Sequence, residues 1–259
     1  MEIQTRRGVM HLWERAGDGA AVVLVHGWSV SGFSWQPVWE RWRGPERLLA
    51  LDLPGTGFSE KPETGYTLEL YADVVEEVLD GLPSPRVLVG HSMGGTVAQL
   101  VALRQPSTTQ GLVLVSPVPA SGVPMNGDER AALRRKGDTA AGMAEVLGSM
   151  MAHGTCEGFA ALLASSASVS AAARYEGLDA FCGANFAERL TALDLPVRVL
   201  SGQRERPLDP DTLQRAVVDR IRGATLQVIE DVAHYPHWES PEKFTRALEV
   251  AVRDVMPLR

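Results

Sequence analysis

Short, continuous runs of apolar residues alternate along this chain of 259 residues with segments whose apolar residues recur every three or four positions. A strand covered on both faces is apolar throughout, whereas a helix that covers a sheet is apolar along one side only. Because parallel strands need crossover connections, this alternation predicts an α/β fold with a doubly wound, mostly parallel sheet. The expected strands span residues 21–25, 48–51, 87–89, 112–115, 197–200 and 226–229.

Helices and edge strands are predicted around these runs. Thr67 is placed to cap a helix whose apolar residues recur at helical spacing. A second helix is expected over residues 93–105, and a third is expected to begin at Ser240 and Pro241, a cap followed by a first-turn proline. Residues 1–15 are expected to add one or two antiparallel strands at the edge of the sheet.

The alternation stops between residues 118 and 191, where strand signals vanish and Ala, Gly, Met and Ser dominate with helical spacing. We interpret residues 118–191 as a helical lid inserted after the sixth strand, and residues 1–117 and 192–259 as the α/β core. The insertion leaves the core where a strand ends, so we expect it over the sheet edge at which such folds bind ligands. A helical subdomain that only adds stability is the alternative.

Composition argues against two classes of protein, disordered chains and nucleic-acid-binding proteins. The chain is 45% apolar and carries 32 Asp and Glu against 25 Lys and Arg, which gives a formal net charge of −7. This apolar fraction excludes a disordered chain, and the acidic excess provides no basic stripe for nucleic acid. The one basic cluster, residues 134–136, is short. We therefore expect no nucleic-acid partner.

Neither a disulfide framework nor a membrane segment is expected. Cys156 and Cys182 are too few for a framework and lack the paired spacing of metal sites, so buried, reduced thiols are the simplest interpretation. The N-terminal region has no apolar stretch of signal-peptide length, and no run of about 18 apolar residues occurs. These features predict a soluble, cytoplasmic protein without a membrane partner.

The strongest chemical signal is the sequence Gly-His-Ser-Met-Gly at residues 90–94, between an expected strand and an expected helix. This is the G-x-S-x-G pattern of a nucleophile elbow in its proper context. Glycines flank the serine because the chain turns from strand to helix within one residue and holds the serine in a strained conformation. A chance match is the weaker interpretation, and Ser92 is predicted to be the nucleophile.

A serine hydroxyl needs a positioned base, and histidine is the usual one. Of the six histidines, His234 follows the last expected strand after a short loop, which brings it to the same sheet edge as Ser92. His234 is therefore the predicted base. His234 and His237 could instead form a metal pair, but no third ligand lies near them in the sequence, and no metal is expected.

Two carboxylates follow the expected strand at 197–200. Asp209 precedes Pro210 and a helical stretch, so capping that helix is a sufficient role for it. Glu205 lies closer to the end of the strand, where its side chain can reach a histidine of the following loop. Glu205 is the preferred acid that orients His234, and Asp209 is the alternative.

Two backbone N–H groups are expected to stabilise the oxyanion of a tetrahedral intermediate. Met93 supplies one at the start of its helix, and Trp28 supplies the other after the first buried strand, with its indole as a wall of the pocket. Methionines of the insertion can line a flexible apolar pocket, although ordinary helix packing explains them equally well. The candidate pocket residues are Trp28, His91, Met125, Met150, Met151, Phe159 and Phe181.

These motifs resemble those of the α/β-hydrolase superfamily, and the resemblance spans nearly the whole chain outside the insertion. The chain looks most like the small lidded serine esterases. In that family the order along the chain is nucleophile, acid, histidine, which Ser92, Glu205 and His234 follow. The matching segments are residues 26–27, 52–59, 90–94, 202–205, 233–234 and 239–244.

Two positions depart from the family pattern. The family usually has aspartate where Glu205 stands and histidine where Thr56 stands. Asp209 and Asp231 therefore stay alternatives for the acid. Because Ser92 is not an aspartate, the resemblance disfavours the haloalkane dehalogenases and epoxide hydrolases of the same fold, which attack through a carboxylate.

The expected activity is hydrolysis of a small-molecule ester or thioester through an acyl-enzyme intermediate, for which no metal or organic cofactor is required. C–C bond hydrolysis, lyase chemistry and lactone-forming acyl transfer in a biosynthetic pathway use the same three residues and stay open. An apolar pocket favours simple esters, whereas a charged group deep in the insertion favours a specialised substrate. A non-catalytic, ligand-binding member of the fold is the remaining alternative, and the complete set of serine, acid and histidine argues against it.

Overall fold

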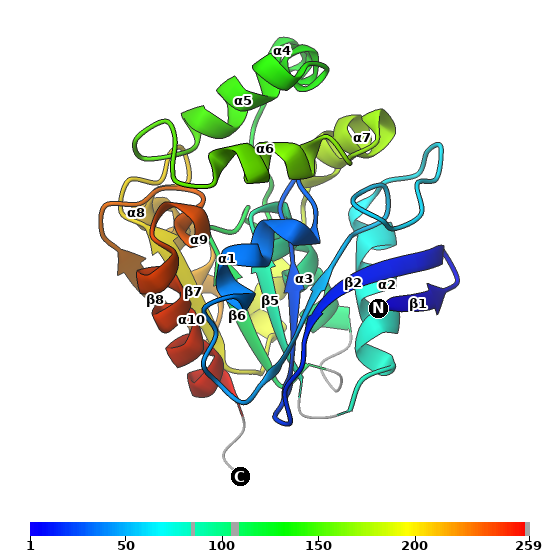
Figure 1. Cartoon of the computed structure of the whole chain (residues 1–259). Coiled ribbons are helices and arrows are strands. Elements are labelled where there is room, and N and C mark those ends of the chain that lie inside the picture. The colour runs from blue at the N-terminus through cyan, green and yellow to red at the C-terminus, as the bar shows by residue number, and fades with distance from the viewer. Residues whose placement is uncertain (84–85, 105–108, 257–259) are drawn as a thin grey trace.

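Eight strands form one sheet in the computed structural model, which describes residues 1–83, 86–104 and 109–256 (Figure 1). The strands are β1 (Glu2–Thr5), β2 (Gly8–Arg15), β3 (Ala21–Val25), β4 (Arg47–Leu51), β5 (Arg86–His91), β6 (Gly111–Val115), β7 (Val197–Gly202) and β8 (Thr225–Ile229). Their order across the sheet is β1-β2-β4-β3-β5-β6-β7-β8. β2 pairs antiparallel with β1 and β4, and all other pairs are parallel. The predicted fold class and the antiparallel strands at the N-terminal edge are confirmed.

Helices cover both faces of this sheet. They are α1 (Gln36–Trp39), α2 (Leu68–Asp80), α3 (Met93–Arg104), α4 (Gly127–Gly137), α5 (Ala140–Ser149), α6 (Phe159–Ser166), α7 (Ala171–Cys182), α8 (Pro210–Ala216), α9 (Pro236–Glu239) and α10 (Pro241–Val255), with 3-10 turns η1 (Gly32–Trp35), η2 (Ala187–Ala192) and η3 (Val218–Arg220). In β3, Val23 and Val25 pack with α2 and α3, whereas Val22 and Leu24 pack with α1 and α10. Side chains of a strand alternate between faces, so a strand between two helical layers must be apolar throughout.

All three predicted helix starts agree with the structure, but one of the two predicted capping bonds is absent. The Thr67 side chain accepts the backbone N–H of Leu70 and caps α2, and α3 begins at Met93. The predicted end of that helix at residue 105 lies outside the described residues. α10 begins at Pro241 as predicted, but Ser240 makes no side-chain capping bond, so its predicted capping role is wrong. Ser240 also ends α9, whose residue Pro236 accepts its backbone N–H, and the backbone is not free to take the usual capping geometry.

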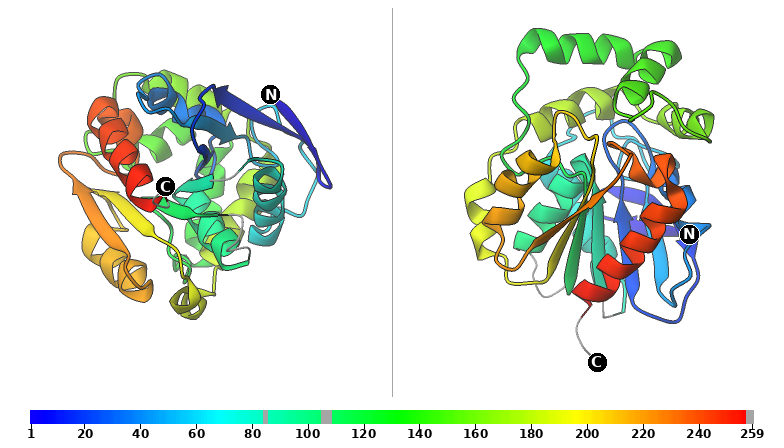
Figure 2. Two further views of the ribbon diagram at one scale, coloured as in Figure 1. Left: turned by 90° about the horizontal axis from the view of Figure 1, so that it is seen from below. Right: turned by 90° about the vertical axis from the view of Figure 1, so that its left-hand side faces the viewer.

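Helices α4 to α7 form a separate layer at one end of the sheet (Figure 1). The side view in Figure 2 shows the same layer above the loops that follow β5, β6, β7 and β8, the carboxyl ends of the parallel strands. All four helices come from the segment that was expected to be a helical insertion. In the parts of the chain that the structure describes, no helix combines the length and apolar character needed to cross a bilayer.

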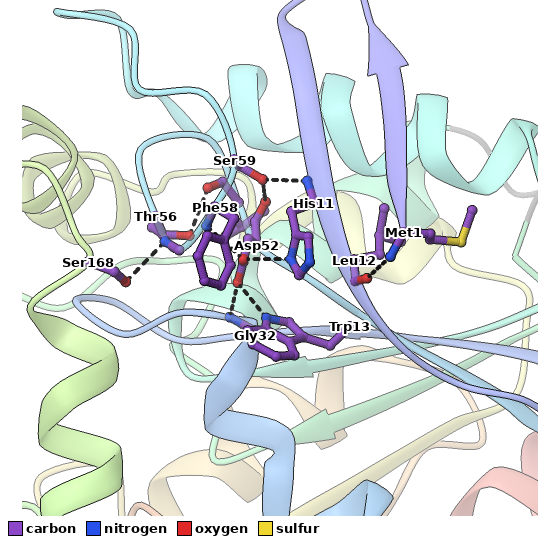
Figure 3. A network of polar contacts seen from close by, with 12 residues as sticks. Met1, His11, Leu12, Trp13, Gly32, Asp52, Thr56, Phe58, Ser59 and Ser168 are labelled. Atoms are coloured by element: carbon purple, nitrogen blue, oxygen red, sulfur yellow. Dashed lines mark hydrogen bonds and ion pairs between the residues drawn. The ribbon is translucent and has the colours of Figure 1, made fainter.

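A buried carboxylate holds the loop after β4. Asp52 is fully buried, and its Oδ1 accepts the backbone N–H of Gly32 at 2.7 Å and the indole N–H of Trp13 at 3.2 Å (Figure 3). Its Oδ2 accepts the backbone N–H of Phe58 at 3.0 Å and lies 3.0 Å from Nδ1 of His11. A carboxylate can be buried when hydrogen bonds from the protein replace those it would make with water. Through its four contacts, Asp52 links β2, η1 and the loop that follows β4.

Replacing Asp52 by asparagine will test this node. The amide can turn its NH2 group toward Nδ1 of His11, which accepts in one tautomer, so the N–H of Phe58 loses its acceptor and the negative charge is lost. The free energy of unfolding is expected to fall by about 2 kcal/mol. Urea denaturation of Asp52→Asn measures the change, with exposed Asp18→Asn as the control. A change within about 0.5 kcal/mol for both variants would contradict the assignment.

Candidate active site

Ser92 sits in the sharp turn between β5 and α3. Its φ is 54°, in the left-handed region that a residue with a side chain rarely adopts. The turn leaves no room for a side chain at position 94, because a Cβ on Gly94 would lie 2.4 Å from the carbonyl oxygen of His26. Glycine at this position lets the start of α3 lie against the loop after β3. The elbow predicted from the sequence therefore has the geometry that its glycines imply.

Other strained residues lie in equivalent positions. Among the described residues, the non-glycine residues with positive φ are Ser29, Ser92, Ser116 and Asp231, at 60°, 54°, 40° and 65°. They follow β3, β5, β6 and β8 respectively. Backbone strain costs about 1–3 kcal/mol per residue and often marks a functional site. In this protein the four strained residues all lie at the end of the sheet that carries Ser92.

A hydrogen-bonded chain links Ser92, His234 and Glu205. The Oγ of Ser92 lies 2.9 Å from Nε2 of His234, and Nδ1 of His234 lies 2.8 Å from Oε1 of Glu205. Glu205 is 1% exposed, while Ser92 and His234 are 8% and 7% exposed and border the pocket described below. A carboxylate only accepts, so Nδ1 carries the proton and Nε2 accepts the serine O–H. This is the arrangement in which a histidine takes a proton from serine.

The pKa of His234 is shifted in the opposite direction to the pKa values of its two buried neighbours, His91 and His237. Burial opposes a charge on His234, but the attraction of Glu205, their hydrogen bond and the charge of Glu239 outweigh it and raise the pKa of His234. Burial and the nearby histidines hold the pKa of His91 well below its usual range and lower that of His237 to about 3. Of these three histidines, His234 alone has a raised pKa and therefore takes up a proton most readily.

The loops after β7 and β8 are joined along their length, which brings acid and base together. The backbone N–H of Arg204 donates to the carbonyl of Val232 at 2.9 Å. A Cβ on Gly202 would come within 2.3 Å of the Ala233 carbonyl oxygen, so the end of β7 touches the segment that carries the next residue, His234. Glu205 extends from this joined pair of loops.

The alternative acids lie elsewhere. Asp209 accepts the backbone N–H of Thr212 and caps α8, as its sequence context predicted. Asp231 is exposed, forms an ion pair with Arg204 at 2.7 Å, and has its Oδ1 3.4 Å from Nε2 of His153. The structure brings Glu205, and neither aspartate, into contact with His234.

A small, largely apolar cavity of about 90 Å³ opens beside Ser92. A larger groove of about 640 Å³ lies between α2, α7 and η2, but no member of the hydrogen-bonded chain lines it. The smaller cavity is the better candidate because it borders the nucleophile and the base. Its lining consists of Trp28, Ser92, Val118, Val123, Met125, Leu133, Met150, Phe181, Glu205, Arg206, Pro207, Leu208, His234 and Tyr235.

Four of the seven predicted pocket residues line this cavity: Trp28, Met125, Met150 and Phe181. Three do not. His91 is fully buried behind the site, where its Nε2–H donates to the His234 carbonyl at 2.8 Å. Met151 is 6% exposed in the core, and Phe159 packs against that core from the start of α6. Sequence spacing did not reveal which side of each helix faces Ser92.

The predicted oxyanion donors belong to two segments that adjoin the nucleophile. Met93 is the first residue of α3, where backbone N–H groups have no partner within the helix. Trp28 follows β3 on the loop that Gly94 approaches, and its side chain lines the cavity with Ser92. The indole N–H of Trp28 donates to the carbonyl of Arg174 at 2.7 Å, which holds this wall of the cavity in place.

Neither a metal cluster nor a cysteine nucleophile gains support from the described residues. Within the described ranges no group of three or more His, Cys, Asp or Glu side chains is placed to hold a metal ion. Cys156 and Cys182 are free thiols, but they are half-buried and not fully buried as expected. Burial raises the pKa of each thiol to about 11, so neither is activated as a nucleophile.

A sequence profile of the Alpha/beta hydrolase family matches residues 22–247. The chain belongs to the alpha/beta hydrolase family. The match includes β3 to β8 and all three members of the hydrogen-bonded chain.

Individual relatives agree with this membership. A pimeloyl-[acyl-carrier protein] methyl ester esterase from Yersinia pseudotuberculosis is 37% identical over 108 residues, 41% of this chain and 40% of the relative. An uncharacterized protein from Mycobacterium tuberculosis is 34% identical over 117 residues, 45% of this chain and 34% of the relative. The matched segment therefore spans well under half of either curated relative. An esterase structure from Exiguobacterium antarcticum superposes with a TM-score of 0.87 at 23% identity, covering 97% of this chain and 98% of that one, which shows the shared fold.

Arg174 on α7 is a buried residue that the sequence analysis did not identify. Its Nε donates to the Ser29 hydroxyl at 2.9 Å, beside Trp28. Its other nitrogens donate to the carbonyls of Gly137 and Ser166, the last residues of α4 and α6. Helix C-termini carry partial negative charge and unpaired carbonyls, so they accommodate a buried guanidinium without a carboxylate. In this hydrolase, Arg174 joins three helices of the upper layer to the loop that carries Trp28.

We expect Arg174→Met to lower the free energy of unfolding by about 3 kcal/mol, because it leaves two helix carbonyls without their donor. Urea denaturation measures the loss, and Arg135→Met, an exposed arginine of α4, is the matched control. Equal stability of the two variants would show that Arg174 does not hold the layer.

Proposed function

We propose that this protein is a serine hydrolase that cleaves small esters or thioesters through an acyl-enzyme intermediate. The observation that carries the proposal is the chain of hydrogen bonds from Glu205 to His234 to Ser92 at the wall of an apolar cavity. Family membership and the esterases among its relatives support the same chemistry.

Acylation begins when Ser92 Oγ attacks the substrate carbonyl carbon and its proton passes to Nε2 of His234. Glu205 faces the imidazolium that forms, and the backbone N–H groups of Trp28 and Met93 donate to the oxyanion. The tetrahedral intermediate collapses as His234 returns the proton to the departing alkoxide or thiolate. The acyl group then remains as an ester of Ser92.

Deacylation repeats these steps with water as the nucleophile. His234 removes a proton from water, which attacks the Ser92 ester, and then protonates Ser92 Oγ as the acid product leaves. The four-helix segment, residues 118–191, acts as the lid in this proposal because Met125, Leu133, Met150 and Phe181 line the cavity from above. No step uses a metal ion or an organic cofactor.

Ser92→Ala is the direct test. The variant keeps the fold but loses the nucleophile, so kcat for p-nitrophenyl acetate will fall by about 10⁴-fold or more. A phosphonate that reacts with serine will label the unmodified protein at Ser92 and will not label the variant. Exposed Ser149→Ala serves as the control. Unchanged ester hydrolysis by Ser92→Ala would rule out the proposal.

The size and polarity of the cavity define the substrate class. An apolar cavity of about 150 Å³ admits a benzene ring. The cavity here is smaller, about 90 Å³, and beyond the catalytic residues its charged lining residue is Arg206, whose side chain is 78% exposed. Arg174 is a charged group buried in the insertion, but its guanidinium binds Ser29 and two helix carbonyls and does not line the cavity. The lining therefore favours simple esters with a short, unbranched acyl group over a specialised substrate.

We expect kcat/KM for p-nitrophenyl esters to be highest for acetyl to butyryl groups and lower for benzoyl and decanoyl groups. Leu133→Ala enlarges the cavity and will raise the decanoate-to-acetate ratio of kcat/KM about tenfold. This factor corresponds to the transfer free energy of roughly two more buried methylene groups of the acyl chain. Leu163→Ala, on α6 and outside the cavity lining, will leave the ratio unchanged. An equal ratio in both variants would contradict this substrate class.

A further inference from the structure

Glu239, the last residue of α9, binds the backbone on both sides of His234. Its Oε1 accepts the N–H of Ala233 at 3.0 Å and the N–H of Tyr235 at 3.1 Å. A single carboxylate oxygen therefore fixes the residues immediately before and after the base.

The other oxygen of Glu239 reaches the helical layer above the site. Oε2 accepts the backbone N–H of Ala152 at 2.7 Å, in the turn that follows α5. The same turn holds His234 directly, because the His234 N–H donates to the carbonyl of Met150 at 3.0 Å. On the opposite side, Nε2–H of His91 donates to the His234 carbonyl. Both backbone polar groups of His234 are thus fixed by neighbours from different elements.

We propose that Glu239 is a positioning residue for the catalytic base, which it holds between the turn after α5 and the end of the sheet. The inference rests on the proposed function, because it gives His234 the role of base. Glu239 makes no contact with the serine and is absent from the cavity lining, so it acts on the reaction through His234. A displacement of about 1 Å in such a group costs roughly 100-fold in rate.

The charge of Glu239 adds an electrostatic effect to this geometry. Burial raises the pKa of Glu239, while the three backbone N–H groups oppose that rise by stabilising the carboxylate. Its charge in turn helps to raise the pKa of His234. The other groups facing His234 are Glu205 from the loop after β7, His91 from β5, and Tyr235 and His237 from its own loop and α9. Since the histidines have lowered pKa values, the carboxylates dominate.

Glu239→Gln separates the two bonds to the loop from the bond to the layer above. The amide oxygen can still accept from Ala233 and Tyr235, but the amide NH2 then faces the N–H of Ala152, so that contact and the negative charge are lost. Glu242→Gln is the matched control, because Glu242 is an exposed carboxylate three residues further on whose Oε1 accepts from Arg41 at 2.8 Å.

We expect Glu239→Gln to lower kcat about tenfold with little change in KM, because Glu239 touches no substrate. Removal of its charge lowers the pKa of His234, so the rising limb of the pH profile of kcat/KM moves to lower pH. NMR titration of imidazole nitrogens in the full-length protein measures the same pKa without substrate. Glu239→Ala, which loses all three bonds, is expected to lower kcat about 100-fold.

An unchanged pH limb and an unchanged His234 pKa in Glu239→Gln would overturn the proposal, even if the variant were less stable. The Gln variant decides the question if the Ala variant does not fold. Should the unaltered protein cleave no ester and bind no phosphonate at Ser92, the proposed function fails. The NMR titration still tests whether Glu239 controls the protonation of His234, so the two failures are distinguishable.

Discussion

The parallel direction of strands β3 to β8 is the constraint on which the rest of the structure depends. Because their carboxyl ends share one edge of the sheet, loops that are distant in the sequence begin side by side. Ser92 follows β5, Glu205 follows β7 and His234 follows β8, so the sheet brings all three loops to one edge. The joined loops after β7 and β8 then carry Glu205 and His234 back to within hydrogen-bond distance of one another and of Ser92. Two apolar layers support that edge, because β3 to β7 each contribute buried side chains to both layers.

Sequence patterns predicted the parts of this structure that depend on local rules. Each expected strand is found, and five of the six are buried as predicted because they are apolar on both faces. β8 is the exception: it lies at the edge of the sheet, and Gln227 and Val228 are exposed. The elbow at Ser92 follows from the turn that its glycines permit. Glu205 was preferred over Asp209 because a helix cap already accounts for the aspartate, and both placements agree with the structure. These inferences needed only neighbouring residues and the shared edge of a parallel sheet.

Features that depend on tertiary contacts were missed. Arg174 binds Ser29 and the end of α4, which are distant in the sequence, and the end of α6, eight residues before it. A lone arginine in a helical segment has no local signature that predicts these contacts. Met151 and Phe159 were misplaced for a related reason, because helical spacing identifies an apolar side without showing which neighbour it meets. Glu239 belongs to a segment that resembles the family, but its contacts across to Ala152 follow from the fold.

The backbone strain at the end of the sheet has a consequence for how such a protein can change. Ser29, Ser92, Ser116 and Asp231 all hold left-handed conformations that glycine would adopt without penalty, yet each carries a side chain. Packing of the core must therefore offset the conformational free energy of these four turns. A mutation that weakens the core leaves less free energy of unfolding to offset them. A protein of this fold with a more stable core can tolerate destabilising changes in the loops around the serine, whereas one with a marginally stable core cannot.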